Sequence, residues 1–287
     1  GLLASTVSHG DVLLVSRIFE GMGYWLTATS IPLLIYRASS NADRPTVLAL
    51  WSLFLPTGSL VLMLISGIVL EHFDWRFPWV LTSIMMLLAT LAVFVVGRSL
   101  PKQAEAAPRG GFLAMVFRKG PLVAALAFGQ YAALYFIIAG FLPLIFITDE
   151  GFGSLAAASI GGGFILMSMF GSVGASWWNR MGMRFSLLIV IGAGSSAALA
   201  LLVFNTGLSI ELRIFAALAL GLLSGLIPSS LFGVIPSLAG SVAAISVMSG
   251  MLAQGSALGQ LSGPPLAAAA VSHANNWNEA TPYMVVL

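Results

Sequence analysis

The chain has 287 residues, of which 59% are hydrophobic and only 8% are charged. A soluble domain carries about 25% charged residues, so the main solvent of this chain is lipid, and a soluble fold is excluded. The formal net charge of +2 gives no basis for binding nucleic acid, and the absence of cysteine excludes a disulfide framework and a thiolate metal site.

Apolar runs long enough to cross a membrane recur along the chain. A transmembrane helix needs about 20 predominantly apolar residues. Eight complete runs reach this length, at 12–36, 46–70, 77–97, 120–147, 154–178, 185–205, 211–236 and 242–271. The pieces 1–8 and 282–287 are interpreted as the end of a preceding helix and the start of a following one. The pattern predicts an all-α, polytopic membrane protein, and we expect its sequence to be cut at both ends.

Basic residues collect in alternate turns between these runs. Nine of the twelve lysines and arginines fall in the turns near 37–45, 98–119, 179–184 and 237–241. The positive-inside rule therefore predicts that these turns are cytoplasmic. The longest of them, 98–119, is interpreted as a linker in which Phe112–Phe117 forms a short interfacial helix. It divides the chain into an incomplete N-terminal bundle, 1–97, and a C-terminal bundle, 120–287, whose last helix is truncated.

Two segments on either side of the linker repeat one another. Arg17-Ile18-Phe19 opens one run and Arg213-Ile214-Phe215 opens another, and Ser66-Gly67 matches Ser262-Gly263 at the same offset. Both copies start on the same face of the membrane, which predicts two bundles related by an axis along the membrane normal. Short matches in an apolar alphabet also arise by chance.

Several motifs resemble those of the major facilitator superfamily. RIFEGMGYWLTATSIPLLI (17–35) is similar to its fourth helix, and SWWNRMGMR (176–184) to its cytoplasmic D-R-x-G-R-R signature, with Asn179 in place of aspartate and Met183 in place of arginine. LAQGSALGQLSGPPL (252–266) resembles the eleventh helix of bacterial members related to cyanate and nitroimidazole transporters. The resemblance implies a fragment running from the end of helix three to the start of helix twelve, with two pseudo-symmetric bundles.

Ionisable and polar groups inside the spans are the candidate site residues, because such groups are costly in lipid. Arg17, Glu20 and Tyr24 follow one face of a helix. Arg17 and Glu20 either serve an anionic substrate and a coupling proton or form a structural pair. Arg213 has no acid within a turn of its own helix that faces it, which favours a packing or lipid-headgroup role.

The second half of the chain contributes neutral polar groups. Tyr131 and Tyr135 share a face beside Gln130, in the run that the resemblance identifies as the cavity-lining helix seven. Their rings suit stacking and hydrogen bonding to a small solute, or they pack between helices. Gln254 and Gln260 lie in the last complete run, where interhelical hydrogen bonds explain them as well as a substrate does. Gly255, Gly259 and Gly263 there form a smooth ridge for close helix packing.

The function predicted is secondary active transport of a small organic anion or drug-like solute by alternating access, driven by an ion gradient. No P-loop for ATP appears, and no catalytic residues, metal ligands or cofactors are predicted. The expected partners are the solute, membrane lipid and a coupling proton, in the inner membrane of a bacterium. Two alternatives stay open: a sensor or scaffold with a transporter fold, and an intramembrane enzyme, which the three histidines in outer turns disfavour.

Overall fold

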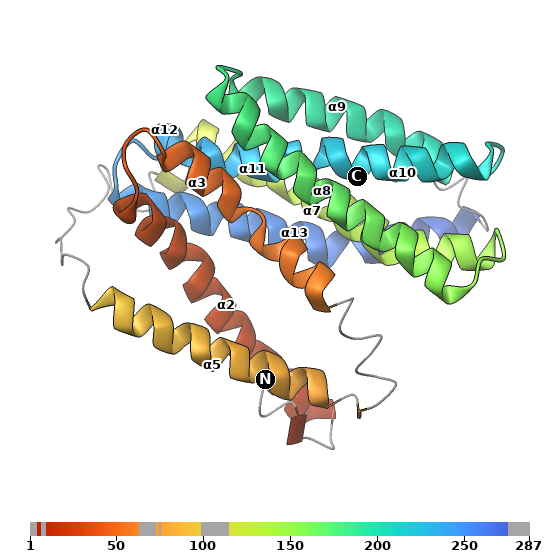
Figure 1. Ribbon diagram of the computed structural model, residues 1–287, viewed down its shortest axis with the longest axis horizontal. Helices are drawn as coiled ribbons and strands as arrows, with labels where there is room; N and C mark the ends of the chain where they lie inside the picture. The colour runs from red at the N-terminus through yellow and green to blue at the C-terminus, as the bar shows by residue number, and fades with distance from the viewer. Residues whose placement is uncertain (1–4, 7–9, 63–72, 75, 99–114, 275–287) are drawn as a thin grey trace. The chain divides into compact units, whose positions relative to one another are not determined.

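The computed structural model of the chain describes residues 5–6, 10–62, 73–74, 76–98 and 115–274. Every regular element in these ranges is a helix (Figure 1). The elements are α2 (Gly10–Ala38), α3 (Arg44–Trp51), α5 (Phe77–Gly97), α7 (Lys119–Thr148), α8 (Ser154–Arg180), α9 (Phe185–Phe204), α10 (Ile210–Ser224), α11 (Leu226–Gly233), α12 (Ile235–Ala239) and α13 (Ala243–Ala274). The predicted all-α fold class is confirmed.

Six helical segments of the described residues are long and apolar enough to cross a membrane. They are Arg44–Leu62, Phe77–Val95, Lys119–Thr148, Ser154–Arg180, Phe185–Phe204 and Ile210–Gly233. The two other predicted spans form α2 and α13, with 29 and 32 residues. Both are long enough at about 1.5 Å per residue, but glycine, serine and other polar residues lower their hydropathy. Residues 63–70, the end of one predicted span, lie outside the described ranges.

Contacts divide the chain into two compact units, which are residues 1–28 with 61–106 and residues 29–60 with 107–287. Helix α3 groups with α7–α13 in the second unit, where it packs against α8 and α11. The division into bundles at 1–97 and 120–287 follows the linker rather than these contacts and stays a prediction. Only part of the predicted interfacial helix, Met115–Phe117, falls in the described ranges.

Two pairs of helices in the second unit approach each other backbone to backbone. In the first pair, α7 and α13, a Cβ placed on Gly259 would overlap the carbonyl oxygen of Gly129. In the second pair, α8 and α10, a Cβ on Gly221 would overlap the carbonyl oxygen of Phe164. The predicted glycine ridge on α13 is therefore used for close packing against α7, which van der Waals attraction stabilises in the absence of a hydrophobic driving force.

Prolines interrupt two of the predicted spans. Pro228 has no N–H to donate to the carbonyl of Ser224, and the run 211–236 is divided there into α10, which ends at Ser224, and α11. Pro56 likewise has no N–H for the carbonyl of Ser52, and α3 ends in a turn at that residue before the chain becomes helical again up to Leu62. In contrast, α13 continues through Pro264 and Pro265.

Candidate functional site

The predicted pair of Arg17 and Glu20 forms on α2, in the first compact unit. The Arg17 Nη1 lies 2.5 Å from a Glu20 carboxylate oxygen, and the two side chains are 32% and 35% exposed. The Arg17 guanidinium also stacks 4.1 Å from the ring centroid of Trp79 on α5 and donates to the Ser16 hydroxyl at 3.1 Å. Tyr24 follows on the same helix and is half-buried. Arg17 is therefore held by three partners from two helices, of which the sequence indicated one.

An aromatic row runs along α7 in the second unit. The ring of Tyr131 lies 5.9 Å from that of Phe128 and 5.8 Å from that of Tyr135, measured between centroids. Tyr135 also contacts Phe164 of α8, and Phe128 contacts Phe232 of α11 edge to face. The row therefore fills the space between α7 and the helices α8 and α11. Its polar atoms are the two tyrosine hydroxyls, and the Tyr135 hydroxyl is buried without a hydrogen bond.

The three predicted glutamines have different surroundings. Gln130 and Gln254 are exposed on α7 and α13, while Gln260 is half-buried and donates from Nε2 to the Ser256 hydroxyl at 3.0 Å. This bond spans one turn of α13, so it satisfies the amide within its own helix.

Of the eight predicted site residues, three lie in the first unit and five lie in the second. Within the described residues, no group of three histidines, aspartates or glutamates is placed to hold a metal ion.

The contacts of Arg213 could not be inferred from the residues that neighbour it in the sequence. Its side chain is 0% exposed and forms an ion pair with Glu150, which is 18% exposed. Its Nε donates to the Val203 carbonyl at 3.0 Å, in the last turn of α9, and the guanidinium lies 5.4 Å from the ring of Phe146. The complete burial of Arg213 contradicts the lipid-headgroup role and supports the packing role. Glu150 was missed because it is 63 residues away, in the turn between α7 and α8.

A further ion pair joins two turns that are predicted to be cytoplasmic. Arg180, the last residue of α8, donates to the Asp43 carboxylate at 3.1 Å and to the Thr46 hydroxyl at 3.0 Å. Arg44 stabilises the turn that presents Asp43, since its Nε donates to the Tyr36 carbonyl near the end of α2 at 2.9 Å. We call Arg180, Asp43 and Thr46 the latch. The latch could not be predicted, because the sequence of each turn does not reveal which distant residues contact that turn.

The degraded signature motif supplies Arg180 and a closed turn after it. The Asn179 amide donates to the Met183 carbonyl at 2.9 Å, a bond that an ionised aspartate at this position could not donate. Gly182 has a φ of 97°, a conformation that side chains with a Cβ rarely adopt. The turn therefore ends α8 sharply and leaves Arg180 directed at α3.

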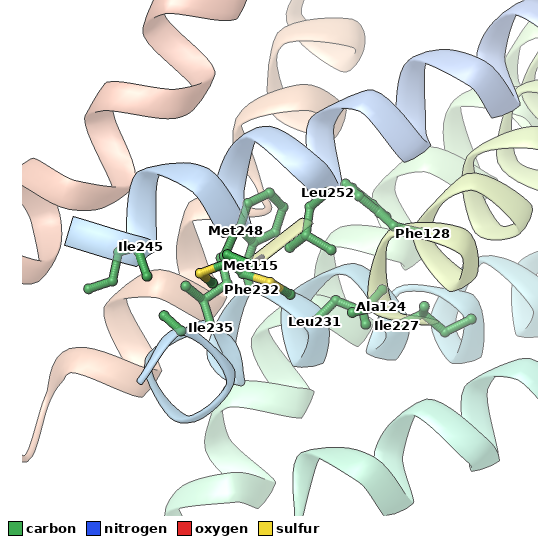
Figure 2. Close-up of a cluster of buried hydrophobic side chains, with 12 residues drawn as sticks. Met115, Ala124, Phe128, Ile227, Leu231, Phe232, Ile235, Ile245, Met248 and Leu252 are labelled. Carbon is green, nitrogen blue, oxygen red and sulfur yellow. The ribbon is translucent and has the colours of Figure 1, made fainter. Parts of the chain in front are cut away.

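Apolar side chains from several helices of the second unit gather in one buried cluster. Met115, which precedes α7, lies beside Phe232 of α11 and Met248 of α13 in one buried cluster (Figure 2). Leu33 and Tyr36 of α2 and Trp51 of α3 pack against this cluster. We call it the plug. Its α12 residues belong to a helix that contacts α3, the helix that carries Thr46 of the latch.

The sequence profile of the Major Facilitator Superfamily matches residues 1–264. The chain belongs to the Major Facilitator Superfamily. Among solved structures it is similar to FucP, a Major Facilitator Superfamily transporter crystallised in the outward conformation, with a TM-score of 0.73 and 15% sequence identity. The match covers 99% of this chain and 75% of FucP, and at this identity it shows a shared fold. No curated protein matches the sequence. The chain is therefore a multi-pass membrane transporter, as its motifs indicated.

Proposed function

We propose that this chain is the main part of a secondary active transporter that moves a small organic solute by alternating access. The latch and the plug carry the proposal. Together they hold α3 and residues 29–38 of α2 against α7, α8, α11 and α13 at one end. An alternating-access carrier requires such a closure at one end while the solute enters from the other.

The two parts of the closure differ in strength. Arg180 and Asp43 are 57% and 54% exposed, and an exposed ion pair contributes about 0.2–1 kcal/mol. Leu33 and Tyr36 of α2 and Trp51 of α3 pack against the plug, and a large apolar side chain contributes up to about 1.5–3 kcal/mol when it is fully buried. The plug therefore provides most of the stability of the closed end, and the latch adds a weaker contact between Arg180 of α8 and the start of α3. A weak latch suits a carrier, because the closed end has to open in every cycle.

Solute recognition is assigned to the predicted polar and aromatic residues. In the second unit, Tyr131 would stack on a solute to which Tyr135, Gln130, Gln254 and Gln260 hydrogen-bond. In the first unit, taken by itself, Arg17 would attract an anionic group and Glu20 would take up a coupling proton. Every one of these side chains lies in a helix rather than in a turn. An ion gradient would drive the cycle in the inner membrane of a bacterium, with the turn 98–119 in the cytoplasm. The proposal assigns no catalysis to the chain.

Counterflow in liposomes tests the proposal directly. The full-length protein is reconstituted, loaded with an unlabelled solute from a panel of organic anions and neutral ring compounds, and challenged with the labelled form. We expect saturable exchange for at least one solute. Absence of exchange across the panel, with folded protein, would favour the sensor or scaffold alternative.

The latch is tested with Arg180→Gln and with Arg184→Gln as the matched control. Arg184 is an exposed arginine four residues along the same turn. Loss of about 0.2–1 kcal/mol shifts the balance toward the open state by about 1.5- to 5-fold. We expect this shift only for Arg180→Gln, measured as the rate at which a cysteine facing the predicted cytoplasmic end is labelled. Equal rates for the two variants would show that the latch does not hold this end closed.

A further inference from the structure

Helices α7 and α13 touch along a row of glycines and run in the same direction. A Cβ on Gly255 would overlap the carbonyl oxygen of Ala125, and a Cβ on Gly259 would overlap that of Gly129. Because the contacting residue numbers rise together, the two helices are parallel. A Cβ on Gly129 would lie 2.9 Å from the Gly255 carbonyl oxygen, so Gly129 and Gly255 each point at the other helix. These two residues therefore fix the side of the pair that each neighbouring side chain faces.

Gln130 and Gln254 face the same side of this pair, because one follows a contacting glycine and the other precedes its partner. Successive residues of a helix are rotated by about 100°, so in two parallel helices these two positions turn to one common side. Phe128, the residue before the contacting glycine of α7, turns to the opposite side and there contacts Phe232 of α11. The two glutamines therefore face away from α11.

Two leucines complete a four-residue group on this side. Leu126 lies one turn before Gln130 on α7, and Leu258 lies one turn after Gln254 on α13. The leucines are 61% and 63% exposed, and both glutamines are exposed as well. The register of the glycine contacts places Leu126 level with Gln254, and Gln130 level with Leu258. The amides thus occupy one diagonal and the leucines the other. We call these four residues the amide patch.

The amide patch suits neither lipid nor another helix. In the described part of the chain neither of its amides makes a hydrogen bond, whereas Gln260 donates to Ser256. An amide in hydrocarbon without a hydrogen bond is costly. Contacts between membrane helices favour small residues, as the glycines of this pair do, but all four residues of the patch have long side chains. Water and a bound solute satisfy both the amides and the leucines.

The amide patch also lies at the depth of a solute site. Gln130 and Gln254 are each about 16 Å from the first residue of their helix at 1.5 Å per residue. This is about half of a 30 Å hydrocarbon core, and carriers bind their solutes near the midplane. One turn before Gln254, a Cβ on Gly250 would lie 3.2 Å from the methyl group of Thr29 on α2. The closed end of the second unit therefore begins one turn below the patch.

We infer that the amide patch binds an uncharged group of the solute in which a hydrogen-bond donor lies beside an acceptor, such as a carboxamide or a lactam. A glutamine amide both donates and accepts, so it matches such a group with two hydrogen bonds. The leucines contact the apolar part of the solute. After Lys119, α7 has no lysine, arginine, aspartate or glutamate, and α13 has none, so a carboxylate bound here would lack a counter-charge. The inference rests on the proposed transport function and names the chemistry that the second unit recognises.

A matched pair of ligands tests the inference. Benzamide and benzoate have nearly the same shape, but only benzamide is uncharged and donates hydrogen bonds. Binding of each is measured with purified full-length protein in detergent. We expect Gln130→Met and Gln254→Met each to weaken benzamide binding by about two- to ten-fold and to leave benzoate binding unchanged. The control is Ser195→Ala on α9, whose hydroxyl is bonded to the Ile191 carbonyl of its own helix, and it should change neither.

Cysteine labelling gives a second measurement that does not depend on the ligand. The chain has no cysteine of its own. In reconstituted full-length protein, Gln130→Cys and Gln254→Cys should react with a charged thiol reagent present on both sides of the membrane, and benzamide should slow both reactions. Val190→Cys, at a 67% exposed apolar position of α9, is the control for a side chain in lipid and should not react. Protection of both glutamine positions would overturn the inference, because lipid or another helix would then cover the patch.

The amide patch and transport fail in different ways. Counterflow of any solute, with benzamide binding that is absent or unchanged in both methionine variants, would retain transport and overturn the patch. Equal weakening of benzoate binding would also overturn it, because the patch would then not select an amide. Benzamide binding that depends on both glutamines, without counterflow of any solute, would retain the patch and refute transport. Size-exclusion profiles of the variants report whether the fold is retained.

Discussion

Removing Glu150 should destabilise the second unit strongly, because it leaves the buried guanidinium of Arg213 without its counter-charge. Arg213 is 0% exposed, so water cannot replace the carboxylate, and its Nη2 already lacks a hydrogen bond. The remaining bond to the Val203 carbonyl does not neutralise the charge. Breaking a buried pair costs about 3–5 kcal/mol. We therefore expect Glu150→Ala to lower the free energy of unfolding by this amount, and Glu150→Gln by less, since an amide oxygen still accepts a hydrogen bond.

The assay is the loss of monodisperse protein after heating in detergent. Each kcal/mol corresponds to about 2–4 °C for a chain of this size, so Glu150→Ala should lower the midpoint by roughly 6–20 °C. The control is Glu211→Ala, an exposed carboxylate at the start of α10, which should change the midpoint little. Joint replacement with Glu150→Leu and Arg213→Met should recover most of the loss, because apolar residues of similar volume replace a buried pair at little cost. A midpoint for Glu150→Ala equal to that of the control would refute this account of the pair.

Two further substitutions follow from the packing. Glu20→Gln should leave expression nearly normal, because Arg17 keeps its contacts with Trp79 and Ser16. A flattened pH dependence of uptake would then assign Glu20 to proton coupling. Fully normal uptake would show that Glu20 is not needed for transport. Gly259→Val should prevent folding, since its side chain would overlap the backbone of α7, whereas Gly162→Ala, which meets nothing within 4 Å, should be tolerated. Comparable yields of these two glycine variants after purification would contradict the close α7–α13 contact.

The lengths of the apolar runs and the composition were sufficient to predict the fold class of the chain. Lipid imposes one strong local requirement, an apolar run of about 20 residues with its backbone bonded internally, and each span meets it independently of the others. The predicted runs at 77–97, 120–147 and 154–178 therefore correspond closely to α5, α7 and α8. The Arg17–Glu20 pair was equally predictable, because its partners are three residues apart on one helix. The helix breaks at Ser52 and Ser224 follow from Pro56 and Pro228, which have no N–H to donate to the carbonyls of those residues.

Only the tertiary structure decided which distant residues meet. Arg213 pairs with Glu150 and Arg180 with Asp43, across separations of 63 and 137 residues. The glycine ridge of α13 was visible in the sequence, but its partner surface on α7 was not. The unsatisfied hydroxyl of Ser230 differs from the satisfied hydroxyl of Ser229 only through the helices that face each of them. The physical reason is that solvent transfer and helix spacing act along the chain, whereas burial, pairing and hydrogen-bond satisfaction depend on how helices far apart in sequence pack together.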